Sequence, residues 1–406
     1  MNIIIKRGQL KGSINAIPSK SYFHRAIIAG ALLGENVRIL CDNKVLSEDI
    51  KASISSICSL GASIKTEENE LIISSVKTKT ETPFLDVRES GSTLRFLIPI
   101  SLVLYDKVII KASSRLIDRG IDGYNEVFAK NNIKVEYKND SIILSGKIKD
   151  DDYVIDGTKS SQYVTGMLFM MAYLKSKHRL YLKSNLASSP YVDITLDVLR
   201  RFGVNISFMN NTYIIDKITK ATSVYEVEGD YSNSAFIDAF NYFNSNVKIK
   251  NLNKDSYQGD KVYLDYFKLL NEKNIEIDIS NCIDLGPILF TFAGLKHGAT
   301  FIGCTRLQIK ESNRVDDLLQ ELNKVGIKAQ IFDNGDKVII YPTCIYDYQN
   351  ISFNSHNDHR LVMALSLILS ITGGKISQAE AVNKSYPLFF DDLKHLELDI
   401  EKEDIC

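Results

Sequence analysis

Apolar residues along this chain are grouped into six runs that recur at a nearly regular interval. Each run follows a cluster of small polar residues, ends at a Gly, Asn or charged residue, and precedes a short segment with the alternation of a strand. The starts lie about 67 residues apart, close to one sixth of the 406 residues, which predicts six related units. The runs, which we predict to be buried helices, are 26–33, 94–105, 164–174, 235–243, 288–295 and 361–371.

A second kind of segment, amphipathic instead of uniformly apolar, lies between several of these runs. Leu196, Leu199 and Phe202 recur at helical spacing in one of them. Each unit is therefore predicted as strand, helix, strand, helix, strand. Six such units over two domains suggest three per domain, with helices packed against sheets in an α/β (α+β) fold. The amphipathic segments and the strands that follow them are 50–60 before 62–64, 194–202 before 204–206, and 315–325 before 327–329.

Length and composition narrow the class of protein. At about 150 residues per domain, 406 residues indicate two or three domains. Lys and Arg number 49 against 50 for Asp and Glu, so the chain lacks the positive field that nucleic-acid binding requires, and we expect no nucleic-acid partner. The longest strongly apolar stretch, 361–372, is shorter than the ~18 residues of a membrane span.

The remaining sequence features concern location and metal chemistry. The amino end has too few apolar residues for a signal peptide, so we expect a cytoplasmic protein that does not enter a membrane. The six cysteines include no C-x-x-C pair, and we interpret them as reduced thiols. The sequence predicts no metal site.

The polar cluster in front of each apolar run is the feature that packing does not explain. Ser, Asn and Asp accept hydrogen bonds from the free amides of a helix start, so each cluster predicts an N-cap. Units related by rotation would bring these helix starts together, where each would favour an anion by about 0.3–1 kcal/mol. The clusters are Pro18–Ser21, Glu89–Thr93, Lys159–Gln162, Asp230–Ser234, Asp284–Pro287 and Asn357–Arg360.

Cationic side chains occur in or beside these clusters. One alone is compatible with a solvated surface charge, but their shared placement favours binding of a small ligand that carries phosphate and carboxylate groups. Asp284 and Glu311 lie among them, where a carboxylate suits an ion pair or proton transfer, and His24 and His359 suit a structural role or the same transfer. The cations are Lys20, Arg25, Arg95, Arg115, Arg119, Arg306, Lys310, Arg314, Arg360 and Lys384.

Six short motifs give the chain its resemblance to a known family. They are Pro18-Ser19-Lys20-Ser21 with Arg25, Glu89-Ser90-Gly91-Ser92-Thr93-Leu94-Arg95, Ser160-Ser161-Gln162, Ser189-Pro190-Tyr191-Val192-Asp193-Ile194-Thr195-Leu196, Lys310-Glu311-Ser312-Asn313-Arg314 and Asn357-Asp358-His359-Arg360. Over nearly its whole length the chain resembles the 5-enolpyruvylshikimate-3-phosphate synthases. These are the enolpyruvyl transferases of the shikimate pathway, which leads to chorismate and the aromatic amino acids.

The resemblance implies a fold and a reaction. The fold is an inside-out α/β barrel of two domains with three βαβαββ units each, one domain comprising residues 1–14 and 227–406 and the other residues 15–226. Substrates would bind in the cleft between the domains. The reaction transfers the carboxyvinyl group of phosphoenolpyruvate to the 5-hydroxyl of shikimate 3-phosphate and releases phosphate, without a metal or organic cofactor. We expect a monomer whose partners are these two small molecules.

The resemblance also implies roles for individual residues. Asp284 would accept the hydroxyl proton and Glu311 would protonate the methylene carbon, with Lys20 and Lys384 completing the catalytic set; whether Glu311 or Lys384 delivers the proton stays open. Shikimate 3-phosphate would be held by Lys20, Ser21, Arg25, Ser160, Ser161, Gln162, Ser188, Asp284 and Lys310. Phosphoenolpyruvate would be held by Lys20, Gly91, Arg115, Gln162, Arg314, Arg360 and Lys384. Gly91 leaves room beside that substrate, and we expect inhibition by glyphosate.

Two other functions remain open from the sequence. The sister enolpyruvyl transferases that act on a UDP-amino sugar share the architecture, but they carry Lys-Asn where this chain has Lys20-Ser21, and a cysteine in the loop that here reads Ser113–Leu116. A non-catalytic anion-binding repeat protein would keep the capping clusters and the arginines. It would have no use for Asp284, Glu311 and Lys384 together.

Overall fold

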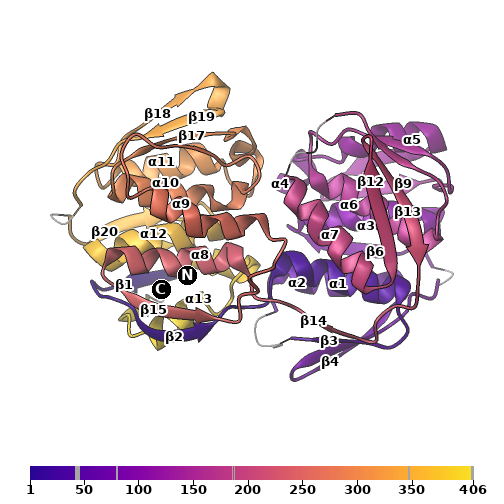
Figure 1. Ribbon diagram of the computed structural model, residues 1–406, viewed down its shortest axis with the longest axis horizontal. Helices are drawn as coiled ribbons and strands as arrows, with labels where there is room; N and C mark the ends of the chain where they lie inside the picture. The colour runs from indigo at the N-terminus through magenta and orange to yellow at the C-terminus, as the bar shows by residue number, and fades with distance from the viewer. Residues whose placement is uncertain (42–45, 79–80, 185, 187, 346–347, 404–406) are drawn as a thin grey trace. The chain divides into compact units, whose positions relative to one another are not determined.

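The computed structural model of the chain describes residues 1–41, 46–78, 81–184, 186, 188–345 and 348–403 (Figure 1). The chain divides into two compact units. Unit 1 comprises Met1–Ile17 and Gly229–Cys406, and unit 2 comprises Pro18–Glu228. The chain therefore passes between the units after Ile17 and again after Glu228, where the sequence-based boundaries were expected after residues 14 and 226.

Three four-stranded sheets in the described part of unit 2 share one order of strands. The strands are β3 (Val37–Leu40), β4 (Ser63–Glu67), β5 (Glu70–Ser74), β6 (Phe84–Arg88), β7 (Lys107–Ala112), β8 (Lys134–Lys138), β9 (Ser141–Ser145), β10 (Tyr153–Ile155), β11 (Leu180–Leu182), β12 (Val204–Met209), β13 (Thr212–Ile218) and β14 (Val224–Glu226). The orders are β14-β3-β5-β4, β6-β7-β9-β8 and β10-β11-β13-β12. In each sheet the first pair is parallel and the other two pairs are antiparallel, so unit 2 contains the same sheet three times.

The helices of unit 2 fall into two kinds. The first helix of each repeat is apolar around most of its circumference and therefore lies in the core, where Phe96 and Phe169 from two such helices pack with ring centres 6.0 Å apart. These helices are α1 (Lys20–Leu33), α3 (Gly91–Leu104) and α6 (Ser161–Leu174). The second helix has an exposed polar side. These are α2 (Glu48–Ser59), α5 (Asn125–Asn131) and α7 (Ser189–Arg201), and the short helices α4 (Ser114–Asp118) and η2 (Asp122–Tyr124) precede α5.

Unit 1 has two sheets of the same kind and one shorter sheet. Its strands are β1 (Asn2–Ile5), β2 (Lys11–Asn15), β15 (Asn246–Lys250), β16 (Glu276–Asp278), β17 (Ala299–Ile302), β18 (Ala329–Phe332), β19 (Lys337–Ile340), β20 (Ile351–Asn354), β21 (Gly374–Ser377) and β22 (Ile400–Glu403). The orders β16-β17-β19-β18 and β20-β21-β1-β22 match those of unit 2. Among the described residues, β2 and β15 form only a parallel pair, so this repeat departs from the predicted unit of three strands.

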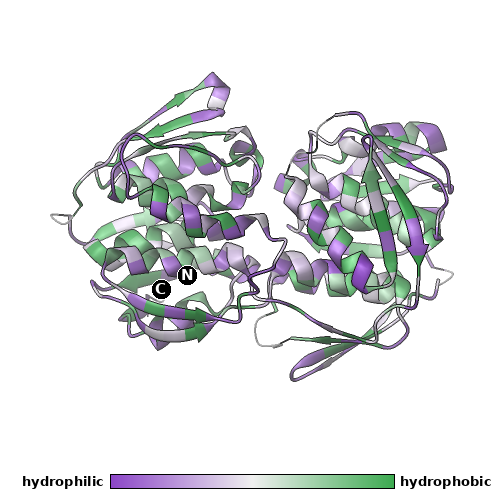
Figure 2. Cartoon of the chain, in the orientation of Figure 1, coloured by the Kyte–Doolittle hydropathy of each residue, from purple (hydrophilic) through white to green (hydrophobic). Residues whose placement is uncertain are grey.

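The helices of unit 1 repeat the division into core and surface helices. The core helices are α8 (Tyr231–Asp238), α10 (Gly286–Leu295) and α12 (His359–Thr372), and the others are α9 (Tyr263–Leu269), α11 (Arg314–Asn323) and α13 (Phe389–His395). Figure 2 shows hydrophobic residues over most of α10, whereas α7 of unit 2 carries both colours. Short helices connect them: η3 (Ala239–Phe243), η4 (Gly259–Val262), η5 (Ile283–Leu285), η6 (Thr305–Ile309), η7 (Asp333–Gly335) and η8 (Ala379–Lys384). Within the described residues, no helix is long and apolar enough to cross a membrane.

Four of the six predicted polar clusters cap the core helix that follows them. The capping oxygens of Ser90, Ser160, Asp230 and Asp358 accept from the backbone amides of Thr93, Gln162, Asn233 and Arg360, respectively. The other two predictions are wrong in this respect. Ser19 precedes α1 without a capping side-chain hydrogen bond, and α10 continues directly from η5, so that no side chain caps it. Asp284 is thereby left for other contacts.

Candidate functional site

A buried arginine binds three carboxylates in unit 1. Arg314 lies in the first turn of α11, and its side chain is 1% exposed. Its Nε donates to Asp358 Oδ2 over 2.7 Å, its Nη1 to Asp284 Oδ1 over 2.8 Å, and its Nη2 to Glu311 Oε2 over 2.7 Å. Burial lowers the pKa of Arg314, but the three carboxylates outweigh it and hold the pKa above its ordinary value. The arginine is therefore permanently charged and held in place.

Three helix starts bring these groups together, and two of them, those of α10 and α12, follow polar clusters that were expected to converge. Asp284 lies in η5 immediately before α10, and Asp358 is the N-cap of α12. Glu311 lies in the turn before α11, whose N-cap Asn313 accepts from Asp316 N. Amide groups that are free at a helix start favour a carboxylate or a bound anion nearby. The local sequence therefore places both candidate catalytic carboxylates where anions are stabilised.

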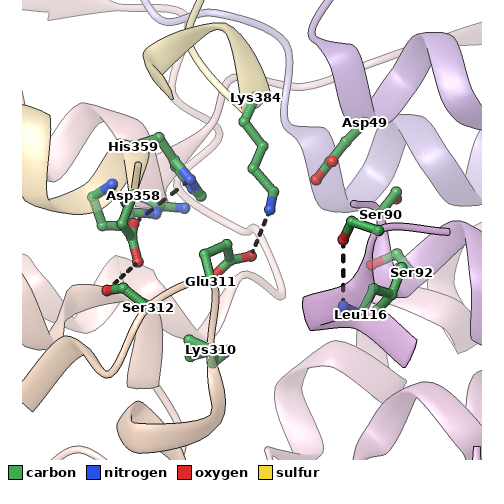
Figure 3. A network of polar contacts seen from close by, with 12 residues as sticks. Asp49, Ser90, Ser92, Leu116, Lys310, Glu311, Ser312, Asp358, His359 and Lys384 are labelled. Atoms are coloured by element: carbon green, nitrogen blue, oxygen red, sulfur yellow. Dashed lines mark hydrogen bonds and ion pairs between the residues drawn. The ribbon is translucent and has the colours of Figure 1, made fainter. Parts of the chain in front are cut away.

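Two lysines complete this network. Lys310 Nζ lies 3.1 Å from Asp284 Oδ1. Lys384, at the end of η8, places its Nζ 3.4 Å from Glu311 Oε1, and Figure 3 shows the Lys384 side chain directed at that carboxylate. Burial raises the pKa of Asp284, but Lys310, Arg314 and Arg360 hold that pKa well below its ordinary value, so Asp284 is ionised at neutral pH.

Arg360 joins the same part of unit 1 from the first turn of α12. It is 2% exposed, donates from Nη1 to the backbone oxygen of Ser232 over 3.1 Å, and lies 5.2 Å from the centre of the Phe236 ring. Its charge also lowers the pKa of Asp284. Unit 1 thus brings together all of its predicted site residues, which are Asp284, Lys310, Glu311, Arg314, Arg360 and Lys384.

In unit 2, the start of α1 carries two predicted binding residues. Lys20 Nζ lies 2.8 Å from Asp49 Oδ2 of α2. Arg25 is 2% exposed, and its guanidinium donates to Thr195 Oγ1 and to the backbone oxygens of Ser21 and Tyr191, each over 2.8 Å. Burial lowers the pKa of Arg25 to about 10, so the side chain stays charged at neutral pH. These three hydrogen bonds fix the orientation of the guanidinium.

A second cluster of unit 2 joins the starts of α3 and α6. Gln162 Oε1 accepts from Arg95 Nη1 over 2.8 Å, and Gln162 Nε2 donates to Ser92 Oγ over 3.2 Å. Arg95 also donates to the backbone oxygens of Arg119 and Gly120. Gly91 lies against this cluster, because a Cβ on it would be 2.9 Å from Arg95 Nη1. The absence of a side chain at Gly91 therefore preserves the Arg95–Gln162 contact.

The remaining predicted residues of unit 2 occupy helix starts. Ser160 is the N-cap of α6, and Ser161, in its first turn, is 5% exposed. Ser188 precedes α7 with φ of 54°, a left-handed conformation that is uncommon outside glycine and is found at functional sites. Arg115 lies exposed on α4.

Some residues of these clusters were not assigned a role from the sequence. Asp49 pairs with Lys20, Asp358 holds Arg314, and Arg95 holds Gln162. Asp358 and Arg95 lie inside motifs that were recognised, whereas Asp49 had no signal beyond its position before an amphipathic helix. His24 takes a structural role, because its Nδ1 lies 2.7 Å from Ser53 Oγ and burial lowers its pKa to about 3. Within the described ranges, no His, Cys, Asp and Glu side chains form a group that could hold a metal ion.

Solved structures show which class of proteins shares this fold. EPSP synthase from Acinetobacter baumannii superposes with a TM-score of 0.78 at 18% identity, with all of both chains covered. The enolpyruvyl transferase NikO from Streptomyces tendae superposes with a TM-score of 0.73 at 14% identity, with 98% of each chain covered. The chain therefore has the fold of the enolpyruvyl transferases.

Sequence comparison narrows the class to one family. The 3-phosphoshikimate 1-carboxyvinyltransferase of Clostridium novyi is 37% identical to this chain, with 97% of both proteins covered. The protein of that name in Clostridium perfringens strain 13 is 35% identical, with 97% of this chain and 98% of the relative covered. Residues 4–273 and 264–393 match the family model of EPSP synthase (3-phosphoshikimate 1-carboxyvinyltransferase). The chain belongs to this family.

Proposed function

We propose that Asp284, Glu311, Lys20 and Lys384 carry out the carboxyvinyl transfer that membership in this family assigns to the chain. That reaction moves the carboxyvinyl group of phosphoenolpyruvate to the 5-hydroxyl of shikimate 3-phosphate and releases phosphate, in aromatic amino-acid biosynthesis. The observation that carries the assignment of residues is the buried Arg314, which holds Asp284 and Glu311 while Lys310 and Lys384 lie against them.

In the addition step, the 5-hydroxyl oxygen attacks the central carbon of phosphoenolpyruvate, and a proton is added to its methylene carbon. Asp284 is ionised, so it accepts the hydroxyl hydrogen bond and receives that proton as the new C–O bond forms. Glu311 or Lys384, which lie in contact, delivers the proton to the methylene carbon. The product of this step is a tetrahedral intermediate that still carries the phosphate.

In the elimination step, the intermediate loses a proton from its methyl group and expels phosphate. The group that delivered the proton is then the base that takes it back, so one acid–base pair serves both steps. Fixed cations stabilise the negative charge that develops on the departing phosphate, because they need no reorganisation during the reaction. We assign this role to Lys20, Arg314, Arg360 and Lys384, with Gly91, Arg115 and Gln162 contributing to phosphoenolpyruvate binding.

The acceptor sugar phosphate would be held mainly by unit 2. Lys20, Ser21, Arg25, Ser160, Ser161, Gln162 and Ser188 supply positive charge and hydroxyl or amide groups there, and Asp284 and Lys310 of unit 1 contact the reacting hydroxyl. Three hydrogen bonds orient Arg25, which reduces the entropy lost when it binds the ligand. We further propose that the enzyme acts as a monomer in the cytoplasm and is inhibited by glyphosate.

Identification of the product tests this function. The purified protein is incubated with phosphoenolpyruvate and either shikimate 3-phosphate or a UDP-amino sugar, and the products are followed by proton and phosphorus NMR. We expect vinyl protons of a new enol ether, together with inorganic phosphate, only with shikimate 3-phosphate. The same signals with the UDP-amino sugar alone would instead assign the sister activity, and no product with either acceptor would leave a non-catalytic anion-binding protein.

A further inference from the structure

Three buried polar atoms around α8 have no hydrogen-bond partner among the described residues. They are Asn233 Nδ2, Asp260 Oδ1 and Arg360 Nε. The three residues are 1%, 4% and 2% exposed, respectively, so bulk water does not replace the missing partners. Because nearly all buried polar groups of folded proteins are hydrogen-bonded, several unpaired atoms of neighbouring residues indicate a site for a polar ligand.

The fold brings these residues together from three elements. Ser232 and Asn233 lie in the first turn of α8, Asp260 lies in η4, and Arg360 lies in the first turn of α12. Arg360 Nη1 donates to the backbone oxygen of Ser232 over 3.1 Å, and η4 packs against α8. We call Ser232, Asn233, Asp260 and Arg360 the α8 subsite.

The α8 subsite adjoins the proposed catalytic groups. Asn233 Oδ1 accepts from the hydroxyl of Ser385 over 3.4 Å, and Ser385 directly follows Lys384. Arg360 acts electrostatically on both Asp260 and Asp284, since its charge lowers the pKa of each. The α8 subsite therefore borders the part of unit 1 that carries Asp284 and Lys384.

Asp260 differs from Asp284 in its protonation. Burial raises the pKa of Asp260 to about 7, and the charges of Asp284 and Asp230 add to that rise. A hydrogen bond from Ser232 and the charge of Arg360 oppose it. Cys282 also faces Asp260, and the negative charge of Asp260 contributes to the raised pKa of that thiol. On α9, Tyr263 faces Asp238 instead. At pH 7, Asp260 is therefore present both as a carboxylate and as a carboxylic acid, which has an O–H donor.

We propose that the α8 subsite binds an oxyanion group of phosphoenolpyruvate, with Asp260 in its protonated form. The proposal rests on the proposed function, which supplies this substrate. Ser232, Asn233 and protonated Asp260 offer neutral donors, and Arg360 offers a planar cationic fork that matches a carboxylate or phosphate. An ionised Asp260 would repel the same group, so substrate binding and protonation of Asp260 favour each other.

This linkage has a definite sign. An anion next to Asp260 raises its pKa further, so binding takes up a proton from solvent when the pH is above about 7. The affinity for phosphoenolpyruvate then falls as the pH rises, approaching tenfold per pH unit. The Asp260→Asn variant keeps a hydrogen-bond donor and cannot ionise. Its affinity for phosphoenolpyruvate should therefore not show this additional decrease with rising pH.

Calorimetric titration of phosphoenolpyruvate, without the acceptor so that no turnover occurs, tests the linkage. The proteins are the wild type, Asp260→Asn and the control Asp255→Asn, which changes an exposed residue of the loop before η4. Titrations at pH 6 to 9, in two buffers of different ionisation enthalpy, report both affinity and proton uptake. Because the ionisation of the ligand affects all three proteins equally, only the difference between the variants reports on Asp260.

Above pH 7, we expect the wild type and Asp255→Asn to take up more protons on binding than Asp260→Asn does, by a fraction that approaches one proton per ligand. Between pH 7 and 8.5, the affinity of these two proteins for phosphoenolpyruvate should fall at least fivefold more than the affinity of Asp260→Asn. Equal proton uptake and equal pH dependence in Asp260→Asn would overturn the proposal. Inorganic phosphate serves as a second titrant: uptake with both ligands assigns the subsite to the phosphate group, and uptake with phosphoenolpyruvate alone assigns it to the carboxylate.

The thermal melting curve of Asp260→Asn shows whether this variant folds. If it does not fold, a second variant tests the proposal. Ser232→Ala should weaken phosphoenolpyruvate binding about five- to tenfold and leave the KM for shikimate 3-phosphate unchanged; unchanged phosphoenolpyruvate affinity would overturn the proposal. The proposed function fails in a different way, by the absence of an enol ether product in the NMR assay. The titrations would still report whether the α8 subsite binds an oxyanion.

Discussion

Asp358 holds Arg314 through an Nε to Oδ2 hydrogen bond of 2.7 Å, and both side chains are almost completely buried. The same carboxylate caps α12 by accepting from the backbone amide of Arg360 over 2.8 Å. One residue therefore positions the arginine that contacts Asp284 and Glu311 and also begins the helix that carries Arg360. This arrangement fixes the positions of the proposed catalytic carboxylates and the proposed binding cations of unit 1 relative to one another.

The first prediction concerns the stability contributed by this pair. Asp358→Asn keeps the cap but removes one of the three carboxylates that bind the buried Arg314. Because Asp284 and Glu311 still compensate its charge, we expect a loss of about 1–3 kcal/mol in the free energy of unfolding. Urea denaturation measures this loss, with Asp265→Asn, an exposed residue of α9, as the control. A loss no larger than the ~0.5 kcal/mol of an ordinary surface substitution would contradict the buried ion pair.

The second prediction concerns the acid–base role of Glu311. Glu311→Gln keeps the size of the side chain but removes its ability to exchange a proton, and we expect kcat to fall by about 10²–10⁴-fold with little change in substrate binding. Steady-state kinetics with both substrates measures the change, and Asp265→Asn again serves as the control. A kcat of Glu311→Gln close to that of the wild type would assign proton delivery to Lys384 instead.

The third prediction follows from the charge on Asp284. The pKa of Asp284 in the folded state lies well below the ordinary value of 3.8. Its ion pairs therefore stabilise the fold fully above about pH 4, and this stabilisation is lost as the pH falls toward the folded-state pKa. We expect Asp284→Asn to be less stable than the wild type at pH 7 and the difference to shrink below about pH 4. Chemical denaturation of both proteins at pH 3 to 7 measures this, and a constant difference would show that Asp284 is not held ionised.

The fourth prediction concerns the space beside Gly91. The added Cβ of Gly91→Ala would lie 2.9 Å from Arg95 Nη1 and 3.5 Å from Gln162 Oε1, so the guanidinium must move. We expect the KM for phosphoenolpyruvate to rise by roughly ten- to a hundredfold, the KM for the acceptor to stay nearly constant, and inhibition by glyphosate to weaken. Unchanged inhibition by glyphosate in this variant would remove Gly91 from the binding site.

The repeated part of the fold could be predicted from the chain because burial leaves a strong pattern. Core helices are apolar nearly all round, so their positions could be predicted from runs of apolar residues. The runs nevertheless begin too late for α1 and α6, which start with the polar residues Lys20 and Ser161. The two-stranded sheet of β2 and β15 could not be predicted, because the alternation of a strand does not reveal which partners it finds.

The site was only partly predictable, for a related reason. The motifs carry the charged residues that contact each other over short separations, such as Glu311 and Arg314. The contact between Arg360 and the Ser232 backbone joins residues 128 positions apart, and Asp260 has no local feature that distinguishes it from a surface aspartate. Its burial and its raised pKa arise only when α8, η4 and α12 pack together.

Phosphate release from phosphoenolpyruvate, measured with and without shikimate 3-phosphate, is the most direct test of the proposed reaction. The wild type should release phosphate only when the acceptor is present, and Asp284→Asn should do so at least about 10²-fold more slowly while remaining folded. Acceptor-independent release, no release at all, or full activity in Asp284→Asn would contradict the assignment of these carboxylates to carboxyvinyl transfer.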